Sequence, residues 1–257
     1  MAEQYEHPVT IAIADMAEFL SFAKRLVVLT GAGISTESGI PDFRSPDGIW
    51  AQHPPATYRA FMTDAAARRD YWRLRRVLAR QVSDAQPNAG HRALAELERR
   101  GILAGVITQN FDGLHQRAGT TPTRLIELHG TSHEAACQTC GARLPMPEVQ
   151  ERVASGDDDP RCVCGGFLKA ATILFGQRVP DAVLDAALDL TRSCDCFLVV
   201  GSSLRVSPAA QLPRIALTAG KALLIINREP TALDGSADVV IHADAGPTLT
   251  QILTALD

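Results

Sequence analysis

Short runs of aliphatic residues recur along the chain, each bounded by glycine or polar residues. This pattern is typical of strands that are buried on both faces of a parallel sheet. Four runs are clear, and two weaker ones follow the same pattern. The predicted strands are residues 26–30, 102–108, 196–200 and 222–226, with 124–128 and 238–242 as two further candidates.

Between these runs, apolar residues recur at the three- and four-residue spacing of amphipathic helices. Strands that alternate with helices imply right-handed crossovers. We therefore predict an α/β fold with a doubly wound, Rossmann-like parallel sheet. The predicted helices are residues 11–25, 64–82, 88–100, 181–193, 208–219 and 246–256.

Two regions interrupt this alternation. Residues 51–99 are helical and rich in arginine, and residues 131–170 hold four cysteines together with several glycines and prolines. We predict that both are insertions, one helical and one metal-binding, that together build a smaller lobe. The larger, ligand-binding lobe would then consist of residues 1–50, 100–130 and 171–257.

The composition narrows the class of protein. Hydrophobic residues make up 46% of the 257 residues, enough for a sizeable core, and the net charge of −4 does not favour nucleic acid as a partner. No apolar run has the roughly 20 residues that a membrane span needs, and the N-terminus lacks a secretory signal pattern. The expected location is the cytoplasm, where clustered cysteines indicate metal binding or catalysis before disulfides.

Polar residues follow four of the predicted strands directly. They are Gly31-Ala32-Gly33, the stretch 109–112 (QNFD), Gly201-Ser202-Ser203 and the stretch 227–229 (NRE). Glycines at such a turn let backbone N–H groups approach a phosphate, and ligands of open α/β sheets bind beyond the carboxyl ends of strands. Helix capping explains one such cluster but not four at one edge.

Four cysteines form two close pairs, Cys137 with Cys140 and Cys162 with Cys164. Four thiolates in two pairs suit a tetrahedral structural Zn²⁺ and leave no open catalytic position. The metal would stand in for a core that this insertion is too short to build. The acidic run 157–159 between the pairs is interpreted as a solvated loop tip, and Cys194 and Cys196 as ordinary buried residues.

Among seven histidines, His129 is the candidate general base, because it follows a predicted strand at the ligand edge. His115 is placed in the first turn of a helix, where hydrogen bonds within the fold are favoured. Nothing in the sequence around the other five indicates catalysis; these are His7, His53, His91, His133 and His242.

These motifs together resemble the sirtuins, which are NAD-dependent protein-lysine deacylases. The resemblance rests on the stretches 31–35 (GAGIS), 39–44 (GIPDFR), 108–112 (TQNFD) and 129–130 (HG), on the four cysteines, and on the stretches 201–206 (GSSLRV) and 227–229 (NRE). They occur in family order over nearly the whole chain. The resemblance implies that NAD is consumed as an electrophile and that the products are free lysine, nicotinamide and O-acyl-ADP-ribose.

The resemblance also implies a role for each matching residue. His129 would take a proton from a ribose hydroxyl, and Asn110 and Asp112 would surround the nicotinamide and its ribose. Phe43 and Arg44 would belong to a cofactor-binding loop. The implied NAD-binding residues are Gly31, Ala32, Gly33, Ser35, Thr36, Asp42, Phe43, Arg44, Trp50, Gln109, Asn110, Asp112, His129, Gly201, Ser202, Ser203, Asn227, Glu229 and Ala245.

An acylated-lysine peptide is the implied partner, added as a strand between residues 174–178 and 203–207. Its contacts would include Phe175, Gly176, Leu204 and Val206. Gln177 stands where many sirtuins have a glutamate. This change is expected to alter which residues are preferred beside the acyl-lysine of the peptide, and it removes no catalytic group. Sirtuins that prefer succinyl-type groups carry a Tyr-x-x-Arg motif, and no tyrosine stands three residues before Arg75 in this chain. Acetyl is therefore the expected acyl group. Arg75 is interpreted as part of the helix surface.

Three other functions are compatible with parts of the sequence. Mono-ADP-ribosyl transfer would use the same NAD site and differ in its product, a modified acceptor. A non-catalytic NAD or ADP-ribose sensor would not need His129, Asn110 and Asp112 together. A zinc-ribbon nucleic-acid binder is disfavoured by the acidic balance of the chain.

Overall fold

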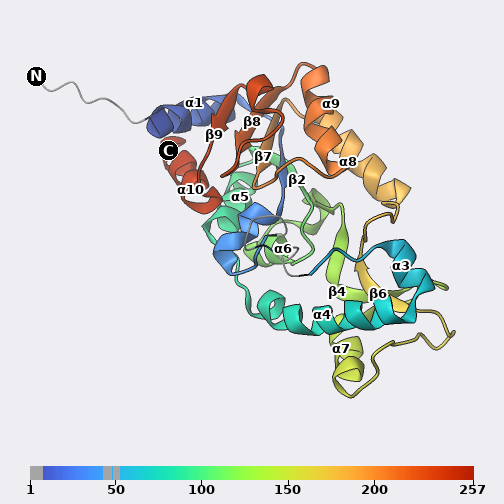
Figure 1. Cartoon of the computed structure of the whole chain (residues 1–257). Helices are drawn as coiled ribbons and strands as arrows, with labels where there is room; N and C mark the ends of the chain where they lie inside the picture. The colour runs from blue at the N-terminus through green and yellow to red at the C-terminus, as the bar shows by residue number, and fades with distance from the viewer. Residues whose placement is uncertain (1–7, 43–47, 49–52) are drawn as a thin grey trace, which may run out of the picture.

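The structure is a computed structural model and describes residues 8–42, 48 and 53–257. A six-stranded parallel sheet runs through the larger part of the molecule (Figure 1). Its strand order is β3-β2-β1-β7-β8-β9. The strands are β1 (Leu26–Thr30), β2 (Leu103–Thr108), β3 (Leu125–Glu127), β7 (Cys196–Val200), β8 (Ala222–Ile226) and β9 (Val239–Ile241).

Helices cover both faces of this sheet (Figure 1). On one face, Val28 and Leu198 pack with α1 (Pro8–Phe22), α5 (Ala89–Arg99) and α10 (Ala245–Ala255). On the other face, Val27 and Phe197 pack with α8 (Asp181–Ser193) and α9 (Leu212–Thr218). Successive residues of a strand point to opposite faces, so aliphatic runs without alternation were the correct signal for a sheet buried on both sides.

The order of the strands reverses at β1. The chain continues to β2 and β3 on one side of β1, and to β7, β8 and β9 on the other. Ligands of doubly wound sheets bind at this switch point, outside the carboxyl ends of the strands. The loops after β1, β2 and β7 are therefore placed next to one another.

The chain also forms a separate three-stranded antiparallel sheet, with strand order β5-β4-β6. Its strands are β4 (Gly130–Cys137), β5 (Arg143–Pro145) and β6 (Leu168–Thr172), and it packs with α7 (Met146–Ala154). Helices α3 (Tyr58–Thr63) and α4 (Ala65–Asp84) lie beside it (Figure 1). The remaining helix, α6 (Leu114–Ala118), follows β2.

The smaller part has an apolar core of its own, which corrects the expectation that zinc replaces one. Phe61 from α3 and Trp72 from α4 are each 1% exposed and pack with residues of the antiparallel sheet and α7. The core is thus assembled from both insertions, and neither insertion contains it alone.

The acidic run 157–159 was also interpreted wrongly. Asp159 accepts two hydrogen bonds from the guanidinium of Arg68, at 2.8 and 3.0 Å, and Arg68 is only 4% exposed. A bidentate pair of this kind satisfies a guanidinium that would be costly to bury alone. The run therefore ties its loop to α4, although Asp158 itself is exposed.

Helix α5 belongs to the core of the large sheet, through Leu94 and Leu97. Residues 51–99, and therefore α5, were assigned from the sequence to the helical insertion of the smaller lobe, so this packing argues for a boundary before α5. The division into two lobes otherwise stays a prediction.

Candidate active site

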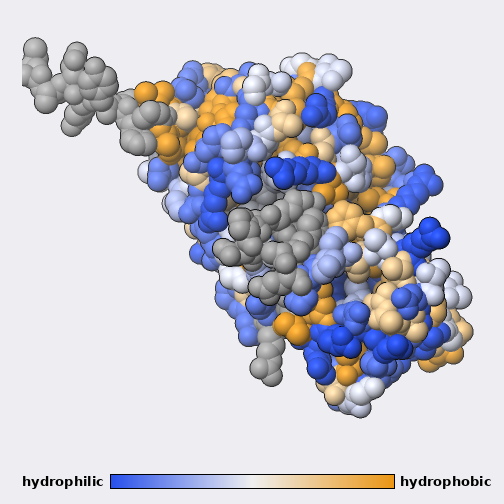
Figure 2. Space-filling model, viewed as in Figure 1, coloured by the Kyte–Doolittle hydropathy of each residue, from blue (hydrophilic) through white to orange (hydrophobic). Residues whose placement is uncertain are grey.

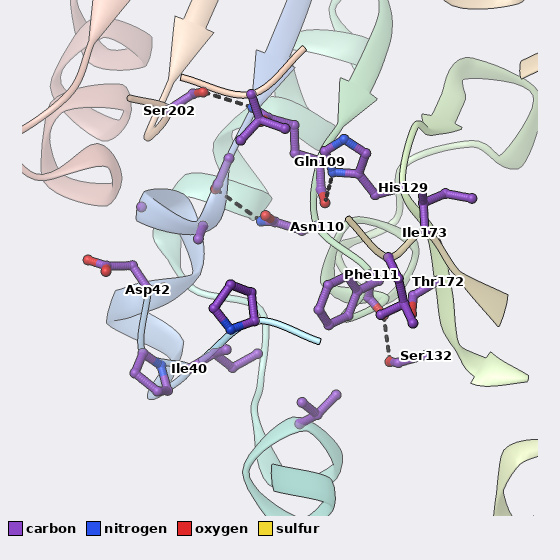
Figure 3. Close-up of a pocket in the computed structure, with 18 of the residues that line it drawn as sticks. Ile40, Asp42, Gln109, Asn110, Phe111, His129, Ser132, Thr172, Ile173 and Ser202 are labelled. Carbon is purple, nitrogen blue, oxygen red and sulfur yellow. Dashed lines mark hydrogen bonds between the residues drawn. The ribbon is translucent and has the colours of Figure 1, made fainter. Parts of the chain in front are cut away.

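A cavity of about 880 Å³ lies at the carboxyl ends of the large sheet's strands. This volume is in the range of small-molecule and cofactor sites. Many of the predicted site residues line it, and Figure 3 shows how several of them face the same space. The predicted residues that line the cavity are Gly31, Ala32, Gly33, Thr36, Asp42, Gln109, Asn110, His129, Phe175, Gly176, Gly201, Ser202, Ser203, Val206, Asn227, Glu229 and Ala245.

Other predicted residues stand elsewhere. Ser35 and Asp112 are buried behind the cavity wall, at 1% and 5% exposure, and Leu204 packs against the hydrophobic core. Phe43, Arg44 and Trp50 lie outside the described residues.

The turn after β1 packs against the turn after β7. The N–H groups of Gly31 and Gly33 donate to the carbonyls of Val200 and Gly201, at 3.0 and 2.9 Å. A Cβ at Gly31 would meet Gly201 O at 2.6 Å, and one at Gly33 would meet Gly201 Cα at 2.7 Å. The glycines are thus required by the packing of two backbones, whatever they also bind.

Gly33→Ala should therefore destabilise the fold by about 1–3 kcal/mol and weaken NAD binding, because backbone on both sides prevents relaxation. Denaturant unfolding and calorimetric NAD titration measure the two effects. Gly235→Ala is the matched control, since its Cβ would have no neighbour within 4 Å. Equal stability of the two variants would contradict this account.

His129 lies directly after β3 and Leu128, and a backbone carbonyl contacts its ring. Nδ1 lies 3.1 Å from the carbonyl oxygen of Gln109 (Figure 3). A carbonyl only accepts, so the neutral ring carries its proton on Nδ1 and its lone pair on Nε2. Nε2 is therefore the nitrogen able to take up a proton.

A buried polar network stands behind this histidine. Asn110 Nδ2 donates to Gly31 O at 3.0 Å and to Ser35 Oγ at 3.1 Å, and Ser35 Oγ donates to Asp112 Oδ2 at 2.8 Å. Asp112 also accepts from the N–H of Leu114, the first residue of α6. The network fixes the loop after β2 against the turn after β1.

Gln109 links the same loop to the opposite side of the switch point. Its Nε2 donates to Ser202 Oγ at 2.8 Å (Figure 3). At the far end of the cavity, Asn227 Nδ2 donates to Glu229 O at 2.6 Å. The four polar clusters predicted at strand ends are thus brought to one cavity.

His115 does not line the cavity. It is 1% exposed, and its Nε2 lies 2.9 Å from Thr30 Oγ1. Burial, with a smaller effect of His91, lowers the pKa of His115 to about 3. His91 is fully buried beside Asn88 and Ser35, and burial lowers its pKa to about 4 although Asp112 opposes the shift.

These two buried histidines predict acid sensitivity. The folded state keeps both rings neutral while the unfolded chain binds protons below about pH 6.5. Stability from this source is complete above that pH and is lost as pH falls toward about 4 for His91 and about 3 for His115. The free energy of unfolding should fall by about 1.4 kcal/mol per pH unit for each histidine. Urea unfolding between pH 7 and 5 checks this.

His115→Gln should remove the contribution of one histidine to the pH dependence of the free energy of unfolding, which is about 1.4 kcal/mol per pH unit. An unchanged slope would show that His115 is not the group that titrates. His129→Gln is the comparison, because its ring is only half-buried.

Several cavity residues were not found from the sequence. Ser132 donates to Phe111 O at 2.6 Å, and Thr172 and Ile173 line the same side (Figure 3). They sit on or beside β4 and β6, whose mixed polar sequences gave no strand signal. Arg75 also lines the cavity and donates to Thr172 Oγ1 at 3.0 Å, which corrects its interpretation as helix surface.

The four cysteines converge on one point. Their Sγ atoms all lie within 4.8 Å of one another, with Cys137–Cys164 at 3.5 Å and Cys140–Cys162 at 3.8 Å. Four sulfurs at about 2.3 Å from one Zn²⁺ would be about 3.8 Å apart, so the donor set fits this metal. The tight second pair is compatible because Val163, between its two cysteines, is fully exposed.

Comparison with known proteins identifies the family. The model of the Sir2 family matches residues 31–208. The chain belongs to the Sir2 family. It is 47% identical to an NAD-dependent protein deacetylase of Streptomyces coelicolor over 90% of this chain and 97% of that protein. It is 43% identical to an NAD-dependent protein deacylase of Archaeoglobus fulgidus over 94% of each.

Solved structures of Sir2 proteins share the fold of this family member. One, from work on the mechanism and regulation of Sir2 enzymes, matches with a TM-score of 0.87 at 42% identity, covering 96% of this chain and 98% of that one. Another holds a p53 peptide and NAD⁺, with a TM-score of 0.85 at 34% identity and coverage of 93% and 96%.

Over the described residues, no helix combines the length and apolar content that crossing a membrane requires. Hydrophilic residues are interspersed with hydrophobic ones over the face seen in Figure 2.

Proposed function

We propose that this cavity binds NAD beside an acylated lysine side chain, and that His129 is the base of the reaction. The chain is an NAD-dependent protein deacetylase/deacylase of the Sir2 family, like its curated relatives. The reaction would release free lysine, nicotinamide and O-acyl-ADP-ribose. A related Sir2 structure holds a deacetylated p53 peptide with 3′-O-acetyl-ADP-ribose, which supports these products.

The orientation of His129 is the observation that carries the catalytic proposal. Gln109 O holds the proton on Nδ1, so Nε2 is ready to accept a proton from a ribose hydroxyl. His115, by contrast, is buried away from the cavity, and burial lowers its pKa to about 3. A ring that resists protonation so strongly is a poor base near neutral pH.

We infer that Asn110 and Asp112 act differently. Asn110 lines the cavity and would contact the nicotinamide end of NAD. Asp112 would act through Ser35, by fixing the hydroxyl that Asn110 also contacts. Asp112 is then a positioning residue and not a direct contact of substrate.

The cavity also suits the remainder of NAD. Gly31, Gly33 and Gly201 line the cavity where the turns after β1 and β7 meet, which is the place where a diphosphate would bind in a doubly wound sheet. Asn227, Glu229 and Ala245 would bind the adenosine end. Bound there, NAD supplies a ribose carbon from which nicotinamide departs.

Cys137, Cys140, Cys162 and Cys164 would hold one structural Zn²⁺. We further propose a Rossmann-like NAD lobe and a smaller lobe formed by the helical and zinc-binding insertions, with α5 counted in the larger lobe. Acylated-lysine proteins are the proposed substrates, the cytoplasm is the proposed location, and acetyl is the proposed default acyl group.

A panel of acylated peptides with and without NAD, read by mass spectrometry, tests the function. We expect a mass loss of the acyl group and formation of O-acyl-ADP-ribose only when NAD is present. ADP-ribose attached to an acceptor, with acyl-lysine unchanged, would instead support ADP-ribosyl transfer. NAD binding without any product would support the sensor alternative.

A further inference from the structure

The two segments proposed to flank the substrate peptide each carry one arginine and no acidic residue. They are residues 174–178 (LFGQR) and 203–207 (SLRVS), so their charged residues are Arg178 and Arg205. The chain as a whole has a net charge of −4. The charge of the peptide-binding edge therefore opposes the charge of the protein.

Arg205 stands on the open side of its segment. Leu204 packs against the hydrophobic core and Val206 lines the cavity, while the side chain of Arg205 between them is exposed. Within the described residues, no carboxylate pairs with Arg205 and no other backbone group bonds its N–H or C=O. Its backbone can thus pair with an added strand, beside a guanidinium that has no counter-charge.

The opposite segment is a tight turn. Gln177 N donates to Leu174 O at 2.9 Å, and Gln177 Oε1 accepts from Leu174 N at 3.2 Å, with Gly176 at a φ of 79°. The carboxamide of Gln177 is thereby used within the turn and brings no charge. Arg178 follows with 83% of its side chain exposed, and its ion pair with Asp181 is itself exposed to solvent.

We propose that this edge selects acyl-lysine peptides with acidic residues directly before and after the lysine. The proposal rests on the proposed function, because it assumes that the acyl-lysine enters the cavity beside Val206. Side chains of a strand alternate, so the two neighbours of that lysine point to the side on which Arg205 is exposed. Opposite charges across neighbouring strands are favourable there, and like charges are unfavourable.

The test compares three acetyl-lysine peptides that differ only at the two neighbouring positions, with glutamate, glutamine or lysine. We expect kcat/KM to fall in that order, by roughly two- to tenfold at each step, with Arg205 contributing most because Arg178 is paired with Asp181. The differences should shrink at high ionic strength, because salt screens exposed charges. Equal kcat/KM for all three peptides would overturn the proposal.

Charge-reversal variants locate the effect. Arg205→Glu should invert the order of the glutamate and lysine peptides, when kcat/KM for each is divided by the kcat/KM of the same variant for the glutamine peptide. Arg178→Glu should weaken the preference. Arg192→Glu is the matched control, because Arg192 is an exposed, ion-paired arginine in the last turn of α8 and outside the two segments. A preference that persists in Arg205→Glu would assign it to another part of the surface.

Peptide binding by fluorescence anisotropy separates this proposal from the proposed function. Tighter binding of the glutamate peptide, lost in Arg205→Glu, supports the charge preference even where no peptide is deacylated. Binding that ignores peptide charge overturns it, even where every peptide is deacylated.

Discussion

His129→Ala should lower the rate of deacylation by about 10²–10⁴-fold, which is the usual loss on removal of a general base. NAD affinity should change far less, because the phosphates would be bound by the turns after β1 and β7. The variant loses the contact between His129 Nδ1 and Gln109 O, but we expect the fold to be retained because water can hydrogen-bond Gln109 O at this half-buried position. Product formation by mass spectrometry and calorimetric NAD titration measure the two quantities.

His133→Ala is the matched control for that variant. His133 also lines the cavity, but its Nε2 lies 3.1 Å from Asp112 O, so it donates to backbone. We expect its rate to stay within a few-fold of the unaltered protein. A His129→Ala protein that binds NAD and deacylates at nearly the original rate would contradict the assignment of the base.

His129→Ala should also affect two steps of the reaction differently. The proton transfer assigned to His129 follows the departure of nicotinamide. Release of nicotinamide that depends on acylated peptide should therefore persist in His129→Ala while formation of free lysine is lost. Loss of both in equal measure would place His129 at the earlier step.

The large sheet was predictable because its signal is local. Parallel strands buried on both faces must be aliphatic throughout, and β1, β7 and β8 have the bounds predicted for them. Helix α1 ends earlier than its pattern suggested. The backbone N–H groups of Lys24 and Arg25 donate to the carboxylate of Asp195 instead of continuing the helix, a contact between distant parts of the chain.

The antiparallel sheet was not predictable from the same kind of pattern. Strand β4 (GTSHEAAC) is largely polar or small, and β6 contains Lys169, which is 1% exposed. The ammonium group of Lys169 donates to Ala170 O at 2.7 Å and also to Thr172 O. A lysine satisfied by backbone carbonyls inside a core is specified by tertiary structure, and not by periodicity.

The site was predictable to the extent that its residues follow strands. Gln109, His129 and Ser202 meet because parallel strands end at one edge. The separation between Asn110 at the cavity and Asp112 behind it depends on how the loop after β2 folds against Ser35. The sequence does not indicate which of these two side chains reaches the cavity.

Removal of the proposed zinc should have the largest effect on stability. Structural zinc sites bind with about 10–16 kcal/mol in small peptides, and much of that is folding free energy. Part of the effect should be offset here, because Phe61 and Trp72 belong to an apolar core that also stabilises the antiparallel sheet. We expect one Zn²⁺ per chain, and a chelator should increase hydrogen exchange in β4, β5 and β6 before it affects β1 or β7.

Cys162→Ser should give the same pattern without a chelator, since it removes a ligand that is only 7% exposed. Cys194→Ala is the matched control, because Cys194 is also buried but stands outside the four-cysteine cluster. It should keep one zinc per chain and normal exchange in the antiparallel sheet. Two results would contradict the assignment: protein purified without chelator that contains no zinc, or a Cys162→Ser protein that keeps full zinc. In either case the four thiols would be close only because the core of the small sheet brings them together.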